Sequence, residues 1–278
     1  MRCLKNTALL LILNSLYVMA YAQNKTRDVE YTKQLSNFIN LYYNNKISSD
    51  SQAQNLFQTS LDSVPQDFDE YQKQVHLARC NYFYGMYVMG EYDFSGIQNI
   101  KSINDKDNES QNLESETKAK KELAATYFDK AISYAEKALA IHAGSDAYLI
   151  MAMSISSNCT VKKTSYVIGN GLKVASLSKK ALALDAKNAS ACYYQYAQDL
   201  YAPEFFANYK RGYQKMYDFL NNSELTFETF DRFNFMTAIG YSFYKRKDFK
   251  TAIEWYQKAL EIYPQNSSVQ KMLKTLSN

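Results

Sequence analysis

Apolar and small residues recur at helical spacing in the segment 233–264, FNFMTAIGYSFYKRKDFKTAIEWYQKALEIYP. In its first half, positions i, i+3, i+4 and i+7 of one helix face are Met236, Ile239, Gly240 and Phe243. In its second half, a comparable face carries Ala252, Tyr256, Ala259 and Leu260. The polar turn KRKD separates the halves, and each helix alone would leave its apolar stripe exposed. The pattern therefore predicts a helical hairpin that ends at Pro264.

The end of this hairpin, KALEIYP at 258–264, has two weaker copies, KALAIHA at 137–143 and KALALDA at 180–186. KALAIHA and KALALDA start 43 residues apart, and KALEIYP starts 78 residues after KALALDA. Each copy is preceded by small or apolar residues at the same spacing, namely Ala131 and Ala135 in one and Val174 and Ser178 in the other. We expect each copy to end the second helix of a hairpin, and a following Ser or Asn to cap the next helix. Repeated helix ends predict stacked repeat units.

Extending this pattern along the chain gives about five hairpins. The first covers 27–62, the second runs from Asp67 to the turn at 90–93 and resumes near Ala119, and the third covers 146–184. We expect a long connection through 160–171, TVKKTSYVIGNG, in the third, and a break at Ala202-Pro203 in the fourth, 188–221. The fifth is 233–264, and the tail 267–276 is predicted to be a helix that caps the last apolar face.

One segment departs from the pattern. Residues 101–118, KSINDKDNESQNLESETK, contain almost no apolar side chains and interrupt the second hairpin. Such a segment buries little surface, which predicts a polar, mobile loop. Its role is either a flap over a binding groove or a tolerated insertion.

The composition agrees with a helical fold. The chain has 278 residues, 46% of them hydrophobic, with only 8 Gly and 3 Pro. Few turn-forming residues argue against an all-β fold and favour long helices. The sequence therefore predicts one all-α domain over 23–278.

The segment 233–264 resembles the tetratricopeptide repeat (TPR). That family places small, aromatic, Ala and Pro residues at fixed positions, which are matched here by Gly240, Phe243, Ala252, Tyr256, Ala259 and Pro264. The fourth position, often Trp, is Met236. The resemblance is full over about 32 residues, partial over 119–186 and weak elsewhere. It implies a right-handed α-α superhelix, a TPR-like solenoid of about five helical hairpins plus a C-terminal capping helix.

The first 22 residues have the pattern of a secretory signal peptide. Arg2 and Lys5 precede the apolar run TALLLILNSLYVM, and Ala20-Tyr21-Ala22 is a small-x-small cleavage site. The early Cys3 lies ahead of the apolar run, so no lipid anchor is expected, and no later run is long enough to span a bilayer. We expect cleavage after Ala22 and a periplasmic or secreted protein. Its net charge would fall from +4 to about +2, which gives no electrostatic case for binding nucleic acid or an anionic membrane.

No catalytic constellation is found in the sequence. His76 and His142 lack partners at metal-ligand spacing, and neither a P-loop nor a GxSxG motif is present. The three cysteines after the signal peptide, Cys80, Cys159 and Cys192, are interpreted as buried small residues. We expect a protein that is not an enzyme and that holds no metal and no cofactor.

The tyrosine and phenylalanine content indicates a binding surface. In 193–219, ten of 27 residues are Tyr or Phe, more than one hairpin can bury on a single stripe. In the TPR family the first helix of each hairpin lines a concave ligand-binding face. The resemblance places twelve residues there: Arg79, Tyr82, Met86 and Met89 in the second hairpin, Tyr194, Gln198 and Tyr201 in the fourth, and Asn234, Thr237, Tyr241, Tyr244 and Lys245 in the fifth. The alternative for each ring is packing between repeats. Only Arg79, Asn234 and Lys245 suit a carboxylate clamp, so we do not expect one.

The resemblance implies a binding function. We expect an adaptor of the cell envelope that recognises a protein or peptide through its concave aromatic face, and we leave homo-oligomerisation open. The alternative is similar to the TPR-type accessory subunits of tripartite ATP-independent periplasmic (TRAP) transporters, which pair with a periplasmic solute-binding protein. In that case the chain would bind or pass a small apolar ligand. An open groove with a polar rim favours the adaptor, and a closed, apolar-lined cavity favours the carrier.

Overall fold

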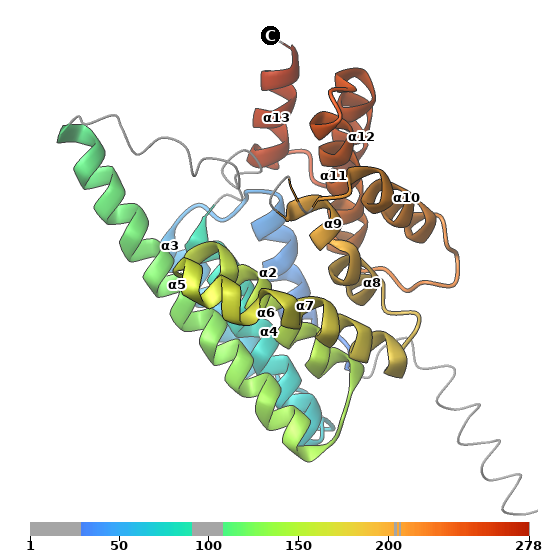
Figure 1. Ribbon diagram of the computed structural model, residues 1–278. Helices are drawn as coiled ribbons and strands as arrows, with labels where there is room; N and C mark the ends of the chain where they lie inside the picture. The colour runs from blue at the N-terminus through green and yellow to red at the C-terminus, as the bar shows by residue number, and fades with distance from the viewer. Residues whose placement is uncertain (1–28, 91–107, 203–204, 206, 278) are drawn as a thin grey trace, which may run out of the picture.

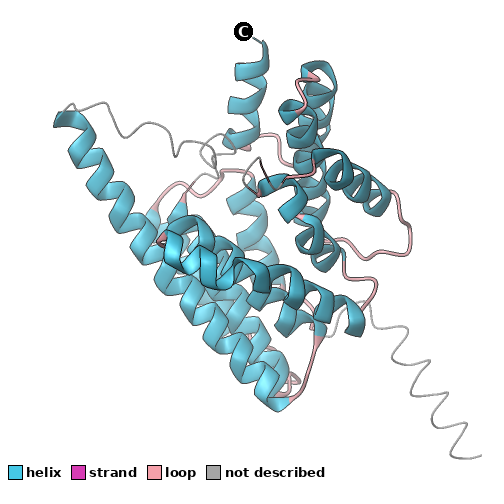
Figure 2. Cartoon of the chain, viewed as in Figure 1, coloured by secondary structure: helices cyan, strands magenta, loops and turns pink. Residues whose placement is uncertain are grey.

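The structure is a computed structural model that describes residues 29–90, 108–202, 205 and 207–277 (Figure 1). Across this part of the chain, helices are joined by loops and no strand is present (Figure 2). The helices are α2 (Lys33–Tyr43), α3 (Asp50–Asp62), α4 (Glu70–Met89), α5 (Asn108–Ile141), α6 (Ser145–Val161), α7 (Thr164–Leu184), α8 (Ala189–Tyr196), α9 (Gln198–Tyr201), α10 (Tyr209–Leu220), α11 (Thr229–Lys245), α12 (Phe249–Ile262) and α13 (Ser267–Ser277). None of the described helices is long and apolar enough to cross a membrane. The predicted signal peptide, 1–22, lies outside the described residues.

The three KAL copies end helices as predicted. Helices α5, α7 and α12 stop at Ile141, Leu184 and Ile262, the fifth residue of each copy. The Ala that follows Lys in each copy is fully buried, and so is the corresponding residue one turn earlier. These residues are Ala138, Ala181 and Ala259, and Ala135, Ser178 and Tyr256. Neighbouring helices pack in chain order, α4 with α5, α6 with α7 and α11 with α12. The prediction of an all-α helical-repeat solenoid is confirmed.

The predicted loop at 101–118 is wrong over its second half. Residues 101–107 lie outside the described residues, but α5 already begins at Asn108. Residues 116–123 are exposed on this helix. Glu, Gln, Lys and Ala have high helix propensity, so a helix nucleated by the packed part of α5 extends beyond it. The polar composition indicates exposure here and not the loss of helix.

The long connection predicted for the third hairpin is also wrong. Helix α6 ends at Val161 and α7 begins at Thr164, so TSYVIGNG forms the first turns of α7. A glycine inside a helix costs only about 1 kcal/mol relative to alanine. The packed second half of α7, with Val174, Ser178 and Ala181 buried, outweighs that cost. The break predicted near Ala202-Pro203 is found, because α9 ends at Tyr201.

Two helix crossings require glycine. A Cβ atom on Gly240 of α11 would lie 2.9 Å from the ring of Tyr256 on α12. A Cβ atom on Gly85 of α4 would lie 2.8 Å from the ring of Phe128 on α5. Both distances are shorter than real Cβ contacts, so these helices approach more closely than alanine permits. The small residue predicted at the crossing of the fifth hairpin is thereby explained.

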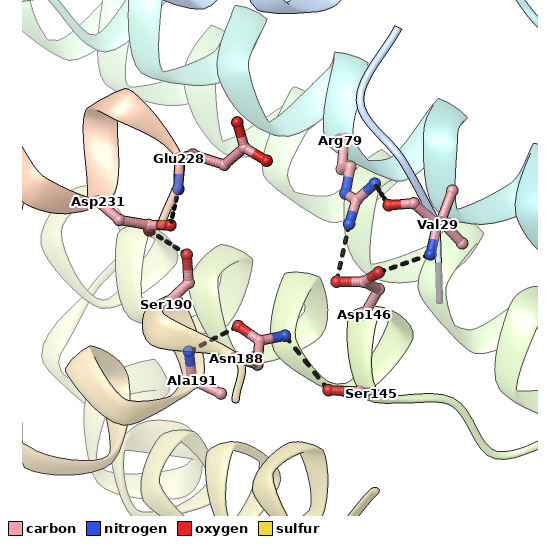
Figure 3. Close-up of polar contacts among 9 residues, drawn as sticks. All are labelled: Val29, Arg79, Ser145, Asp146, Asn188, Ser190, Ala191, Glu228 and Asp231. Carbon is pink, nitrogen blue, oxygen red and sulfur yellow. Dashed lines mark hydrogen bonds and ion pairs between the residues drawn. The ribbon is translucent and has the colours of Figure 1, made fainter. Parts of the chain in front are cut away.

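The start of the described chain is fixed inside the solenoid by a buried ion pair, which we call the Val29 anchor (Figure 3). Arg79 Nη2 of α4 lies 2.8 Å from Asp146 Oδ1 of α6, and both side chains are almost fully buried. Arg79 also donates to the carbonyl of Val29 at 2.6 Å, and the Val29 amide donates to Asp146 Oδ2 at 2.9 Å. Figure 3 shows that further polar bonds join the starts of successive first helices, with Asn188 donating to Ser145 and Ser190 to Asp231.

The solenoid curls so that its first helix meets its last hairpin. Helix α2 lies between α4 and α11 and contacts both (Figure 1). Three asparagines at its C-terminal end, Asn40, Asn44 and Asn45, accept hydrogen bonds from Tyr263, Gln265 and Ser267 at 2.8, 2.9 and 3.1 Å. These contacts, which we call the Asn clasp, join residues more than 220 positions apart in the chain. The concave side of the solenoid is therefore closed along this edge.

Candidate binding cavity

The concave side encloses a cavity of about 600 Å³. Its walls come from the first helices of the hairpins, α4, α6, α8 and α11, and from both partners of the Asn clasp. Asn45 and Ser267 line the cavity and also belong to the clasp. Because α2 closes onto the turn before α13, the space is walled along this edge and forms a partly open cavity.

Aromatic rings form most of the large surfaces of this cavity. Eight tyrosines and one phenylalanine line it: Tyr42, Tyr43, Tyr82, Tyr84, Tyr87, Tyr193, Tyr194, Tyr201 and Phe233. Neighbouring rings hold one another in place, for example Tyr193 and Tyr194 with centroids 5.2 Å apart, or Tyr43 edge-on to Phe233 at 5.5 Å. Rings packed in this way present fixed, flat surfaces to an occupant.

The tyrosine hydroxyls are paired across the cavity. Tyr82 and Tyr194 lie 3.1 Å apart at their oxygens, and Tyr193 donates to Tyr201 at 3.2 Å. The Asn234 amide donates to the Tyr43 hydroxyl, also at 3.2 Å. Each bond joins different repeats or successive helices, so the hydroxyls are held in fixed positions.

Burial keeps these phenols neutral. Desolvation raises the pKa of Tyr82, and it raises the pKa values of Tyr43 and Tyr194 well above the usual value. The same cause raises the pKa of Tyr193 to about 12. Neutral phenols can donate and accept hydrogen bonds at physiological pH.

Charge is confined to the edge of the cavity. Among its described lining residues, the ionisable side chains other than tyrosine are Asp50 and Lys120, and both residues are exposed. The Tyr87 hydroxyl donates to Asp50 at 2.8 Å, and burial together with this carboxylate raises the pKa of Tyr87 to about 12. The interior therefore offers neutral hydrogen-bonding groups, which suit binding and orientation of a molecule.

Apart from Arg79 and Met89, ten candidate residues were predicted from the sequence, and six of them lie on this cavity. They are Tyr82, Met86, Tyr194, Tyr201, Asn234 and Thr237, from three different hairpins. The family register thus brings together the residues expected to share a concave face.

The other four candidates lie elsewhere. Tyr241 is 2% exposed and stacks on Tyr201 behind the cavity wall, with centroids 5.2 Å apart. Tyr244 packs toward Phe249, and the Lys245 ammonium lies 5.7 Å from the Tyr209 ring centroid. The Gln198 amide donates to the carbonyl of Gly171 on α7 at 3.1 Å. Tyr241 is buried because α9 and α10 cover that side of α11.

Two further side chains named with the site have structural contacts. Arg79 belongs to the Val29 anchor, and the Met89 sulfur accepts from Thr160 at 3.5 Å. Arg79, Asn234 and Lys245 consequently do not converge on one group.

The tyrosines that the sequence reasoning missed come mainly from the first hairpin and the end of α4. Tyr42, Tyr43, Tyr84 and Tyr87 lie outside the family's ligand positions or in a hairpin with weak patterning. The run LYYNN at 41–45 could have indicated their position. Two aromatic residues followed directly by polar residues indicate a helix end that contacts another part of the chain.

Cysteine and histidine take no part in the cavity. Cys80 and Cys192 are buried, Cys159 is half-buried, and all three are free thiols. Burial raises the pKa of the Cys192 thiol to about 12, which makes it unreactive. His142 is exposed and stacks on Tyr71.

Comparison with known proteins agrees with the fold. Residues 236–266 match the family model of the tetratricopeptide repeat. The chain carries a tetratricopeptide repeat. The fold of the whole is similar to a crystal structure of a thermophilic TPR protein from Thermus thermophilus, with a TM-score of 0.50 and 12% sequence identity over 89% of this chain and 99% of that one. A search of curated proteins finds no match. The TPR fold suggests protein interaction or scaffolding, and proteins of this kind are generally adaptors without enzymatic activity.

Proposed function

We propose that this protein is a non-enzymatic binding protein of the cell envelope that takes a small ligand into its tyrosine-lined cavity. The observation that carries the proposal is the closure of α2 onto the turn between α12 and α13, which walls the concave face along one edge and leaves a partly open cavity. Its volume of about 600 Å³ falls among small-molecule pockets, which span roughly 300–1,000 Å³. The location in the envelope rests on the predicted signal peptide.

The cavity is preorganised for binding. Its rings are held by neighbouring rings and its hydroxyls by one another, so few side chains would lose freedom when a ligand enters. A low ordering cost leaves more of the contact energy as affinity. Delivery of the ligand to a transport system, as in the TRAP-associated subunits, is the role that fits an exported carrier.

A second candidate is an adaptor that binds a protein partner. The TPR fold favours it, and so does an exposed apolar face on the first half of α7, where Ile168 and Leu172 are 78% and 82% exposed. This face lies on the outside of the hairpin and not on the cavity. The two candidates therefore place the binding site on different surfaces.

One experiment separates the two candidates. The protein and two variants, Met86→Trp and Ile168→Ser with Leu172→Ser, are purified from envelope extract and analysed by native mass spectrometry. Met86 lines the cavity and is 9% exposed, so tryptophan there fills the space. A bound small molecule lost only in Met86→Trp supports the carrier. A protein partner lost only in the α7 variant supports the adaptor, and retention of every bound molecule by both variants contradicts both proposals.

A further inference from the structure

The chemistry of the cavity walls restricts what can bind there. The proposed function leaves the ligand's class open, and the inference below rests on that function. Its evidence is the charge, hydrogen-bonding capacity and shape of the lining residues.

Charge gives the first restriction. The carboxylate and ammonium among the described lining residues, Asp50 and Lys120, are on exposed residues at the edge. An anion placed among the inner rings would lose water and gain no opposite charge, which strongly disfavours its binding, whereas a cation would still be attracted by the ring faces. The Met86 and Ala197 side chains contribute no charge either.

Hydrogen bonding gives the second restriction. The Tyr82–Tyr194 pair and the Asn234–Tyr43 pair place neutral hydroxyl and amide groups on facing walls. Tyr43 and Tyr82 are each raised in pKa by burial and so remain phenols. A ligand without hydrogen-bonding groups would gain no hydrogen bond from these hydroxyl and amide groups.

Shape gives the third restriction. The inner walls are flat rings at fixed angles, such as Tyr42 and Tyr43 at 74° with centroids 5.3 Å apart. Flat rings favour planar partners that can stack or meet them edge-on.

We infer that the cavity binds small, planar aromatic molecules that carry a hydroxyl or a similar hydrogen-bonding group and no negative charge. The ligand's ring lies among the tyrosine rings, and its polar group exchanges hydrogen bonds with Tyr194, Tyr82 or Tyr43. Recognition is by ring contacts and neutral hydrogen bonds, and anionic analogues of the same size are rejected.

Three naphthalene probes test this inference by isothermal titration calorimetry at pH 7. The set is 2-naphthol, naphthalene and 2-naphthalenesulfonate, which share one ring system. We expect one site for 2-naphthol. We expect at least tenfold weaker binding of the sulfonate and several-fold weaker binding of naphthalene.

Two tyrosine variants test whether a hydroxyl of the cavity causes the preference for 2-naphthol over naphthalene. Tyr194→Phe removes one hydroxyl of the Tyr82–Tyr194 pair and should reduce the preference for 2-naphthol over naphthalene. Tyr217→Phe is the matched control, because Tyr217 is 40% exposed on α10 and does not line the cavity. An equal loss in both variants would contradict a role for the cavity hydroxyl.

The Met86→Trp variant separates failure of this inference from failure of the proposed function, with its fold checked by circular dichroism. If the sulfonate binds as tightly as 2-naphthol and Met86→Trp blocks both, the cavity is a binding site and the inference about ligand class is wrong. If no probe binds but a native small molecule is lost in Met86→Trp, the class is again wrong and the function stands. If Met86→Trp leaves 2-naphthol binding unchanged, both are wrong.

Discussion

The two ends of the solenoid are held in different ways. The last hairpin, α11–α12, is fixed by contacts within itself, where Gly240 admits the ring of Tyr256 and the small residues Ala252 and Ala259 are fully buried. The first hairpin, α2–α3, also buries core side chains such as Leu35 and Phe38, and polar contacts to distant segments add to this, through the Val29 anchor before it and the Asn clasp after α2. A repeat pattern thus specifies a hairpin, while closure of the solenoid needs interactions that no repeat contains.

The largest effect is expected at the Val29 anchor. Asp146→Ala would leave the buried Arg79 guanidinium without its carboxylate, and breaking a buried ion pair in this way costs about 3–5 kcal/mol of the free energy of unfolding. Urea denaturation measures the loss. The segment around Val29 should also become sensitive to proteolysis, since its amide donates to Asp146.

A surface ion pair provides the control for this variant. Glu116→Ala breaks the exposed Glu116–Lys120 pair, which lies 2.8 Å apart on α5. We expect no measurable change in the urea midpoint. Equal urea midpoints for Asp146→Ala and Glu116→Ala would show that the Val29 anchor contributes no more to the free energy of unfolding than an exposed ion pair does.

A smaller loss is expected in the last hairpin. Gly240→Ala places a methyl group 2.9 Å from the Tyr256 ring, and overpacking of this kind costs about 1–3 kcal/mol. Gly169→Ala on α7 is the matched control, because no atom lies within 4 Å of the added Cβ. Replacing that helical glycine should stabilise the protein by about 0.5–1 kcal/mol. Changes in thermal midpoint of opposite sign would confirm the contrast, and a stabilising Gly240→Ala would overturn the close crossing.

The difference between the ends also explains what the sequence could predict. Local periodicity identified the last hairpin, although α11 begins at Thr229 and not at 233, and the KAL copies contain the ends of α5 and α7. It failed at 108–118 and 164–171, where polar or glycine-containing segments are helical because a packed neighbouring stretch continues into them. Polar composition indicates that a segment is exposed. An exposed segment can still be helical when it continues a helix that is packed elsewhere.

The repeat pattern likewise predicted the part of the site that lies at repeat positions, and it missed the rest. Tyr82, Tyr194 and Asn234 were found because they occupy repeat positions on first helices. Tyr43 and Tyr84 were missed because their place on the cavity depends on how the solenoid closes. Tyr241 was assigned to the surface, although α9 and α10 bury it. No repeat register contains that information.

Loosening the clasp should have a modest and local effect. Asn44→Ala removes one hydrogen bond, to the amide of Gln265, and a typical loss is about 0.5–1.5 kcal/mol. We expect faster hydrogen exchange in α2 and α3 and little change in α11 and α12. Asn221→Ala is the control, since its amide bonds only within its own helix end, to the carbonyl of Tyr217. Faster exchange throughout the chain would mean that the two ends are not independently held.

The smallest effect is expected from pH, and it too concerns the first hairpin. His76 Nε2 lies 2.8 Å from the Ser60 carbonyl of α3, and burial, with a contribution from Arg79, lowers the pKa of this imidazole below 6.5. The unfolded chain then takes up a proton more readily than the folded one, so stability is full above pH 6.5 and falls as the pH drops through and below that value. Between pH 7.5 and 6.0 one such group can remove at most about 1 kcal/mol. Urea midpoints at these two values should differ less in His76→Gln, which cannot titrate, than in the parent. An equal pH dependence in both would assign it to other groups, and a midpoint that rises on acidification would reverse the sign argued for the buried imidazole.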